Sequence, residues 1–169
     1  MTLIGEKVVR ALNQQLNREL YSAYLYLSMS AYFESLGLRG FANWMRVQWQ
    51  EELMHAMKFL DYIADRGGRV ELFAIEEPPK SWSSPLNAFE FGLDHEKKVS
   101  KFISDLVELS IAEKDHATFN MLQWFVKEQV EEERSFGEIT GKLRLAQDDS
   151  KILLLIDGEL AKRKFGGGE

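Results

Sequence analysis

Apolar residues recur at alternating spacings of three and four through four long stretches of the chain, the pattern of helices that bury one face. All three prolines fall in a single connection, and short turns containing glycine or polar residues separate the other stretches. The pattern predicts helices over about residues 6–34, 39–66, 85–113 and 116–146, followed by a short apolar helix over about 151–164. The predicted fold class is therefore all-α.

The lengths of the connections predict how these helices are arranged. Short turns join the first pair and the last pair, so each pair is antiparallel. The connection before Pro85 has about 16 residues and can reach roughly 50 Å, whereas a helix of about 28 residues is about 42 Å long. It can therefore cross the full bundle and make the second and third helices parallel. Ser84 and Pro85 suit the N-cap and first turn of the third helix.

A flexible linker between two separate helical hairpins is the alternative arrangement. Neither hairpin could bury its apolar face alone, which favours one domain over residues 1–165. The glycine-rich residues 166–169 are expected to form a disordered tail.

Polar side chains interrupt the apolar stripe of every long helix near its middle. The interruptions follow a spacing that occurs twice, in which a carboxylate is followed 33 and 36 residues later by two further donors. The donors of the first half are Glu19, Glu52 and His55, and those of the second half are Glu96, Gln129 and Glu132. Folding the halves together about a pseudo-two-fold axis would bring six donors to one point in the bundle.

A pair of metal ions explains these interruptions better than an ordinary core does. A lone glutamate in a stripe is usually marginal or salt-bridged, but here four stripes are interrupted at matching depth. No arginine or lysine occupies a stripe position, and ionised carboxylates rarely stay buried without a cation or partner. Oxygen donors with one imidazole favour iron or manganese over structural zinc.

Further residues lie close to this predicted centre. Glu51, Glu128 and Glu131 are one step around their helices from the central donors, where they either hold a third ion or form a solvated face. Tyr26 shares the face of Glu19, so it either contacts a ligand or donates an electron, or it is plain core packing. His95 is expected at the surface, and His116 is expected to cap the fourth helix.

Composition removes several other classes of function. The formal charge is −6 without a basic run, so nucleic acid is a poor partner. The lack of cysteine excludes disulfides, thiolate zinc sites, iron–sulfur clusters and a cysteine nucleophile. The chain has no stretch of about 18 consecutive apolar residues, so no segment is expected to span a membrane. The N-terminus lacks a signal-peptide pattern, and the cytoplasm is the expected location.

Four segments closely resemble the prokaryotic non-haem ferritins, and the resemblance extends over essentially the whole chain. These segments are NRELYSAYLY at 17–26, QEELMH at 50–55, FNMLQWF at 119–125 and EQVEEE at 128–133. The resemblance implies a ferritin-like four-helix bundle with one long crossover and a short fifth helix.

The same resemblance implies a role for each donor. One iron would be bound by Glu19, Glu52 and His55, and a second by Glu52, Glu96 and Glu132, with Glu52 bridging the two. Gln129 matches a position beside the ligands, and Tyr26 matches the tyrosine that adjoins the centre. The positions that supply a third iron site match Glu51, Glu128, Glu131 and Glu132.

Differences from related families favour the non-haem ferritins over the other ferritin-like proteins. Bacterioferritins and di-iron oxygenases carry two Glu-x-x-His motifs, whereas the second pair here is Gln129 and Glu132. Leu53 stands where bacterioferritins have the methionine that binds haem, so no haem is expected. Rubrerythrins need cysteines, and miniferritins lack the fifth helix and place their ligands across a dimer interface.

The implied function is iron storage. As a ferroxidase, the protein would oxidise Fe²⁺ with O₂ or H₂O₂ and deposit hydrated ferric oxide inside a hollow homo-oligomer, for which the resemblance implies 24 chains. The apolar fifth helix agrees with such a shell, because an isolated chain would expose it. The alternatives are a di-iron or manganese oxygenase with an organic substrate, and a metal-free structural bundle.

Overall fold

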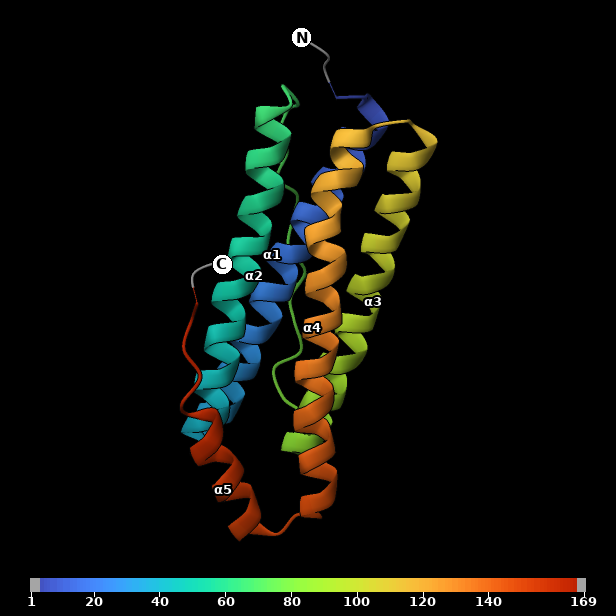
Figure 1. Cartoon of the computed structure of the whole chain (residues 1–169). Coiled ribbons are helices and arrows are strands. Elements are labelled where there is room, and N and C mark those ends of the chain that lie inside the picture. The colour runs from blue at the N-terminus through green and yellow to red at the C-terminus, as the bar shows by residue number, and fades with distance from the viewer. Residues whose placement is uncertain (1–3, 167–169) are drawn as a thin grey trace.

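The computed structural model describes residues 4–166 as five helices with no strand among them (Figure 1). The helices are α1 (Glu6–Ser35), α2 (Arg39–Asp65), α3 (Pro85–Ala112), α4 (His116–Ala146) and α5 (Ser150–Leu160). The predicted all-α fold and its four long helices are confirmed. The fifth helix is shorter than predicted, because it ends at Leu160 and not near residue 164. Of the predicted disordered tail, Gly166 is exposed and residues 167–169 lie outside the described residues.

Local sequence chemistry explains where the helices begin and end. Ser84 caps α3, since its hydroxyl accepts a hydrogen bond from the Asn87 amide at 3.0 Å, and Pro85 occupies the first turn. The predicted cap at His116 is wrong. The carboxylate of Asp115 accepts the Thr118 amide at 3.0 Å and caps α4, because a short acceptor suits the free amides of a first turn.

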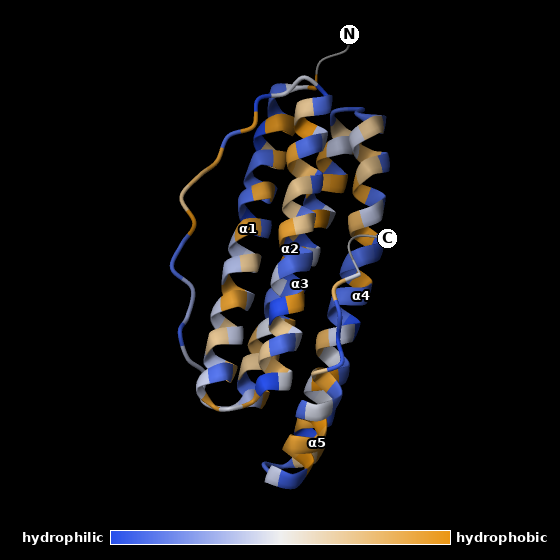
Figure 2. Ribbon diagram, turned by 90° about the vertical axis from the view of Figure 1, so that its left-hand side faces the viewer, coloured by the Kyte–Doolittle hydropathy of each residue, from blue (hydrophilic) through white to orange (hydrophobic). Residues whose placement is uncertain are grey.

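The long crossover, residues 66–84, follows the outside of α1 along the bundle (Figure 2). Asn13 fixes its start by donating to the carbonyl of Arg69 and accepting from the amide of Glu71, both at 2.9 Å. Further along, the hydroxyl of Ser28 donates to the carbonyl of Pro79 at 2.6 Å. The crossover therefore returns the chain to the end of the bundle where α2 began, and α2 and α3 run parallel (Figure 1).

The buried interior consists of two apolar clusters on either side of a polar layer. Phe33, Phe41 and Phe89 centre the cluster nearer α5. Phe59 and Phe125, with ring centroids 4.2 Å apart, centre the other. Because both apolar clusters exclude water, the polar layer between them is held at low dielectric.

Helix α5 packs against the beginning of α2. A Cβ atom on Gly40 would lie 1.7 Å from the carbonyl oxygen of Asp157, so only glycine allows this approach. The carboxylate of Asp157 also accepts the Phe41 amide at 3.0 Å and supplies the cap that Leu38 lacks. The outer face of α5 remains apolar and open, with Leu155 74% exposed. In Figure 2, orange along α5 marks its hydrophobic residues.

None of the described helices combines the length and the apolar character needed to cross a membrane.

Candidate metal centre

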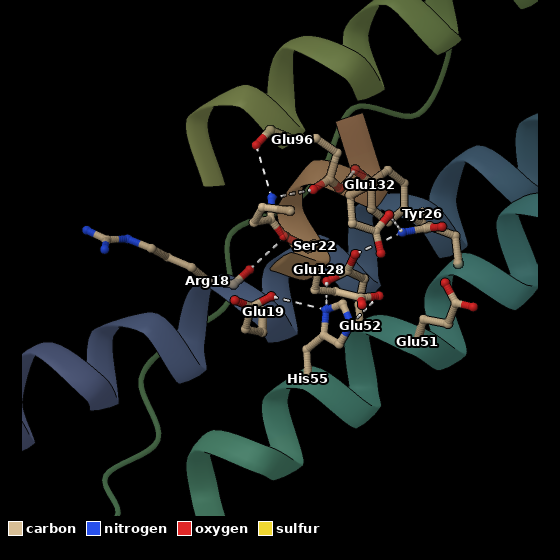
Figure 3. A network of polar contacts seen from close by, with 12 residues as sticks. Arg18, Glu19, Ser22, Tyr26, Glu51, Glu52, His55, Glu96, Glu128 and Glu132 are labelled. Carbon is tan, nitrogen blue, oxygen red and sulfur yellow. Dashed lines mark hydrogen bonds and ion pairs between the residues drawn. The ribbon is translucent and has the colours of Figure 1, made fainter. Parts of the chain in front are cut away.

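The polar layer contains all six donors of the repeated spacing, and each of these residues is 5% exposed or less. They come from all four long helices, and Figure 3 shows the acidic residues and His55 turned toward one another. The six are Glu19 on α1, Glu52 and His55 on α2, Glu96 on α3, and Gln129 and Glu132 on α4. The structure thus brings together what the spacing predicted.

In the half built by α1 and α2, two buried polar atoms have no hydrogen-bond partner. His55 donates through Nδ1 to Glu52 Oε2 at 3.2 Å, and this nitrogen lies 3.9 Å from Glu19 Oε2. Gln15 donates to the other Glu19 oxygen at 2.7 Å. Glu19 Oε2 and His55 Nε2 remain unpartnered. Buried polar atoms are rarely left so, and these two are suited to a cation.

In the half built by α3 and α4, each of the three donors has a hydrogen-bond partner. Glu96 accepts from the Tyr26 hydroxyl and, at 3.1 Å, from Gln129 Nε2. The same amide nitrogen lies 3.2 Å from the Ser100 hydroxyl. Glu132 accepts from Gln48 at 2.7 Å. Gln129 therefore acts in this structure as a donor beside Glu96.

Three overlapping sets of donor atoms are close enough to hold a metal ion, with all atoms of a set within 4.8 Å of one another. The sets are Glu19, Glu52 and His55; Glu52, Glu96 and Glu132; and His55, Glu128 and Glu132. Glu52 belongs to both of the fully buried sets, which is the position of a bridging ligand.

Burial and mutual repulsion shift the proton affinities of the centre. Burial, followed by the charge of Glu52, raises the pKa of both Glu19 and Glu96 to about 8. Burial and the charge of Glu96 raise the pKa of Glu132 well above 4.5. Burial would also raise the pKa of Glu52, but its ion pair with His55 leaves it lowered. The metal-free centre thus retains protons that a bound cation would replace.

The chain is similar over most of its length to proteins of one family. The sequence model of the ferritin-like domain matches residues 9–146. A bacterial non-heme ferritin of Bacteroides fragilis is 45% identical over 95% of this chain and 100% of its own. One from Staphylococcus saprophyticus is 40% identical over 99% and 100%. The open-pore ferritin of the hyperthermophilic archaeon Archaeoglobus fulgidus is 61% identical, with a TM-score of 0.95 over 95% of this chain and 99% of that one.

The chain belongs to the ferritin family.

Around the centre, this ferritin separates the three residues predicted to hold a third ion. Glu128 Oε1 lies 3.7 Å from His55 Nε2 and belongs to one of the metal-binding sets. Glu51 is instead paired with Arg163 at 2.7 Å, and Glu131 is paired with Arg134. Only Glu128 is therefore placed toward the centre without a competing cation.

Tyr26 on α1 and His95 on α3 lie next to each other, with ring centroids 6.0 Å apart. Burial and the charge of Glu96 raise the pKa of Tyr26 well above 10, so its hydroxyl keeps the proton that it donates to Glu96. The predicted surface position of His95 holds only in part, because the side chain is half-buried. Its Nε2 lies 2.8 Å from the Ser22 hydroxyl and its ring packs between those of Tyr21 and Tyr26. Burial lowers the pKa of His95 to about 4.

Three side chains around the centre were not predicted to act there. Gln15 and Gln48 donate to Glu19 and Glu52, each from four positions earlier in the same helix. This repeated Gln-x-x-x-Glu spacing is a signal from which both could have been found. Arg163 has no such signal, because it lies beyond α5 and outside the four helical stripes, yet its guanidinium donates to Gln48 and Glu51.

Proposed function

We propose that this ferritin oxidises Fe²⁺ at the buried centre and stores the ferric product. Iron storage itself is the function of the ferritin family, to which the chain belongs. The observation that carries the more specific proposal is Glu19 Oε2, a buried atom without a hydrogen-bond partner that lies among further carboxylates and His55. A cation is the partner that this oxygen lacks.

The proposed roles follow the overlapping sets. Glu19, Glu52 and His55 would bind one Fe²⁺, and Glu52, Glu96 and Glu132 would bind the other. Gln48 donates to both Glu52 and Glu132, at 3.0 and 2.7 Å, and holds these two carboxylates in position across the helices. Tyr26 fixes Glu96 by its hydrogen bond.

The proposed reaction takes one electron from each of two Fe²⁺ ions and gives both electrons to O₂ or H₂O₂. Glu19 and Glu96, whose pKa values lie near 8, release protons when iron binds at neutral pH. A set of carboxylates and a single imidazole offers hard donors that bind iron weakly. Weak binding suits iron that enters as substrate and leaves as hydrated ferric oxide.

A closed homo-oligomer, of 24 chains by family resemblance, is the proposed container. The exposed apolar face of α5, including Leu154 and Leu155, supports an interface between chains. The −6 charge of each chain would sum over the shell and attract Fe²⁺, an effect that salt weakens. Light scattering should find a large assembly, and a monomer or dimer at micromolar concentration in both low and high salt would contradict storage.

The proposal includes a third iron beside Glu128 and Glu132, the absence of haem, and a cytoplasmic location. The first rests on the family resemblance and on the closeness of Glu128 and Glu132, whose donor atoms lie within 4.8 Å of each other. The other two rest on the sequence alone.

Aerobic mixing with excess Fe²⁺ tests the function against its alternatives. The iron-storage proposal expects oxidation of many ions per chain, with ferric product retained in the protein fraction. A di-iron or manganese oxygenase would stop after about two ions per chain, and a metal-free structural bundle would not exceed the rate in buffer. Either result would contradict the proposal.

A further inference from the structure

The segment after α5, residues 161–166, is fastened to α2, and we call it the C-terminal arm. The side-chain amide of Asn43 donates to the carbonyl of Leu160 at the end of α5 and to two carbonyls of the arm, with a shortest distance of 3.0 Å to that of Arg163. The guanidinium of Arg163 lies 4.1 Å from the ring centroid of Trp44 and donates to the Trp44 carbonyl at 3.2 Å. The arm therefore delivers one positive charge to a defined place.

This positive charge lies at the edge of the metal centre. Arg163 Nη2 donates to Gln48 Oε1 at 2.9 Å and to Glu51 Oε2 at 2.7 Å. The other end of the Gln48 amide donates to Glu52 and Glu132. Arg163 thus fixes the orientation of the amide that holds the two carboxylates. The Arg163 and Glu51 side chains are only 20% and 22% exposed, so solvent screens this pair less than a surface pair.

A third metal ion at the centre would be repelled by the positive charge of Arg163. It would lie beside Glu128 and Glu132, whose donor atoms lie within 4.8 Å of each other. Glu51 is a further carboxylate, directly before Glu52 on α2, and the charges of His55 and Glu128 act on it. The guanidinium occupies one oxygen of Glu51 and repels a divalent ion from the other.

We propose that Arg163 is a built-in counter-cation that weakens the third ion site while the C-terminal arm is docked. Glu51 becomes an ion ligand when the guanidinium withdraws, so occupation of the third site and release of the arm are coupled. The inference rests on the proposed function, because the third ion adjoins the two iron positions.

The test measures binding of Zn²⁺, a redox-inert probe, to the assembled metal-free protein by equilibrium dialysis and calorimetry. We compare the parent protein with Arg163→Ala and with Lys164→Ala, which removes the same charge one residue away. Lys164 is exposed and forms no hydrogen bond or ion pair within the described residues. We expect Arg163→Ala to bind the third ion at least about tenfold more tightly, since hydrogen bonds between charged groups contribute at least that factor.

Two further variants connect the effect to Glu51 and to the guanidinium. Adding Glu51→Ala to Arg163→Ala should abolish the gain in affinity. Arg163→Lys keeps the charge but lacks the planar fork that reaches two acceptors, so its affinity should fall between those of the parent and Arg163→Ala. Circular dichroism and light scattering check that each variant keeps its helices and assembly.

Trypsin provides a readout that does not depend on affinity. In the parent, saturating Zn²⁺ should accelerate cleavage after Lys162, Arg163 and Lys164, because the arm leaves α2 when the third site fills. Arg163→Ala should be cleaved quickly after the two lysines with or without Zn²⁺.

The possible outcomes separate this inference from the proposed function. Two tight Zn²⁺ ions per chain with an unchanged third affinity in Arg163→Ala would overturn the role of the arm alone. So would a gain that persists without Glu51. Absence of the two tight ions from every protein would overturn the proposed centre and the inference with it.

Discussion

The two halves of the metal centre have the same spacing of donors in the sequence but differ in how completely these donors are hydrogen-bonded. In the half from α1 and α2, the Glu19 and His55 side chains each keep a buried atom without a partner. In the half from α3 and α4, Glu96 is bonded to Tyr26 and Gln129, and Glu132 is bonded to Gln48. An ion entering the first half meets a Glu19 oxygen that no hydrogen bond occupies. In the second half it must replace hydrogen bonds.

The difference teaches that near-symmetry in a bundle need not give two equal sites. The two halves diverge at two equivalent positions, where His55 and Glu52 in one half correspond to Glu132 and Gln129 in the other. An amide can donate a hydrogen bond to a neighbouring carboxylate, whereas an ionised carboxylate only accepts. Gln129 therefore supplies a hydrogen bond to the carboxylate of its own half. We expect the first ion to bind in the other half, between α1 and α2.

Removing the residue shared by both halves should have the largest effect. We expect Glu52→Ala to slow Fe²⁺ oxidation at least about 100-fold, because loss of a supporting residue alone can cost 10- to 100-fold. His55→Ala, which affects one half, should also slow it sharply. Stopped-flow absorbance measures the rate. Asp61→Ala, an exposed change on the same helix, is the control and should leave the rate unchanged. A normal rate in Glu52→Ala would place the centre elsewhere.

Making the halves more alike should have the next largest effect. Gln129→Glu replaces the donor beside Glu96 with a carboxylate at the position equivalent to Glu52, which supplies a second possible bridge. We expect the variant to retain Fe³⁺ about tenfold longer. Release of ferric product into the core can be followed by Mössbauer spectroscopy after a single addition of iron. Release as fast as in the parent would show that Gln129 is not the cause of the asymmetry.

A smaller effect is expected from removing one supporting hydrogen bond in the half built by α1 and α2. Gln15→Ala removes the hydrogen bond to Glu19 while leaving its free oxygen and the donors from α3 and α4 in place. The first Zn²⁺ should bind about tenfold more weakly, the lower end of what one hydrogen bond to a charged group contributes. Calorimetry separates the two tight ions, and an effect confined to the second ion would reverse our order of binding.

The smallest effect concerns the stability of the metal-free protein. The pKa of Glu19 and of Glu96 is raised from 4.5 to about 8, so the stability that each contributes is present below pH 4.5 and is lost as the pH rises through about 8. Glu19→Gln and Glu96→Gln should therefore each raise the melting temperature by a few degrees relative to the parent at pH 9, and less at pH 5. Calorimetric scans with a chelator present measure this. An equal gain at both pH values would show that the protons are not responsible.

Much of the centre could be predicted because its donors follow a short spacing within each helix and a longer spacing that occurs twice in the sequence. Helical spacing alone places Glu52 and His55 on one face, and the recurrence of the spacing at Glu96 predicts which helices meet. The family resemblance then extended these predictions to individual roles. The length of the crossover, which Asn13 and Ser28 hold against α1, was enough to predict parallel α2 and α3.

The errors concern residues whose positions depend on contacts between distant segments. The direction of His95 from its own helix suggested solvent, but Ser22 and two tyrosines on α1 cover it. Arg163 reaches Glu51 only because Gly40 allows α5 to pack on α2 and Asn43 then holds the chain beyond it. No periodicity within residues 151–164 carries that information.

The position of Arg163 beyond α5 also has a consequence for the rigidity of the centre. The six donors lie on the four long helices, whereas Arg163 lies outside every described helix. Local opening of an exposed segment costs less free energy than unfolding a packed helix. The counter-cation can therefore leave the centre while the six donors stay in place.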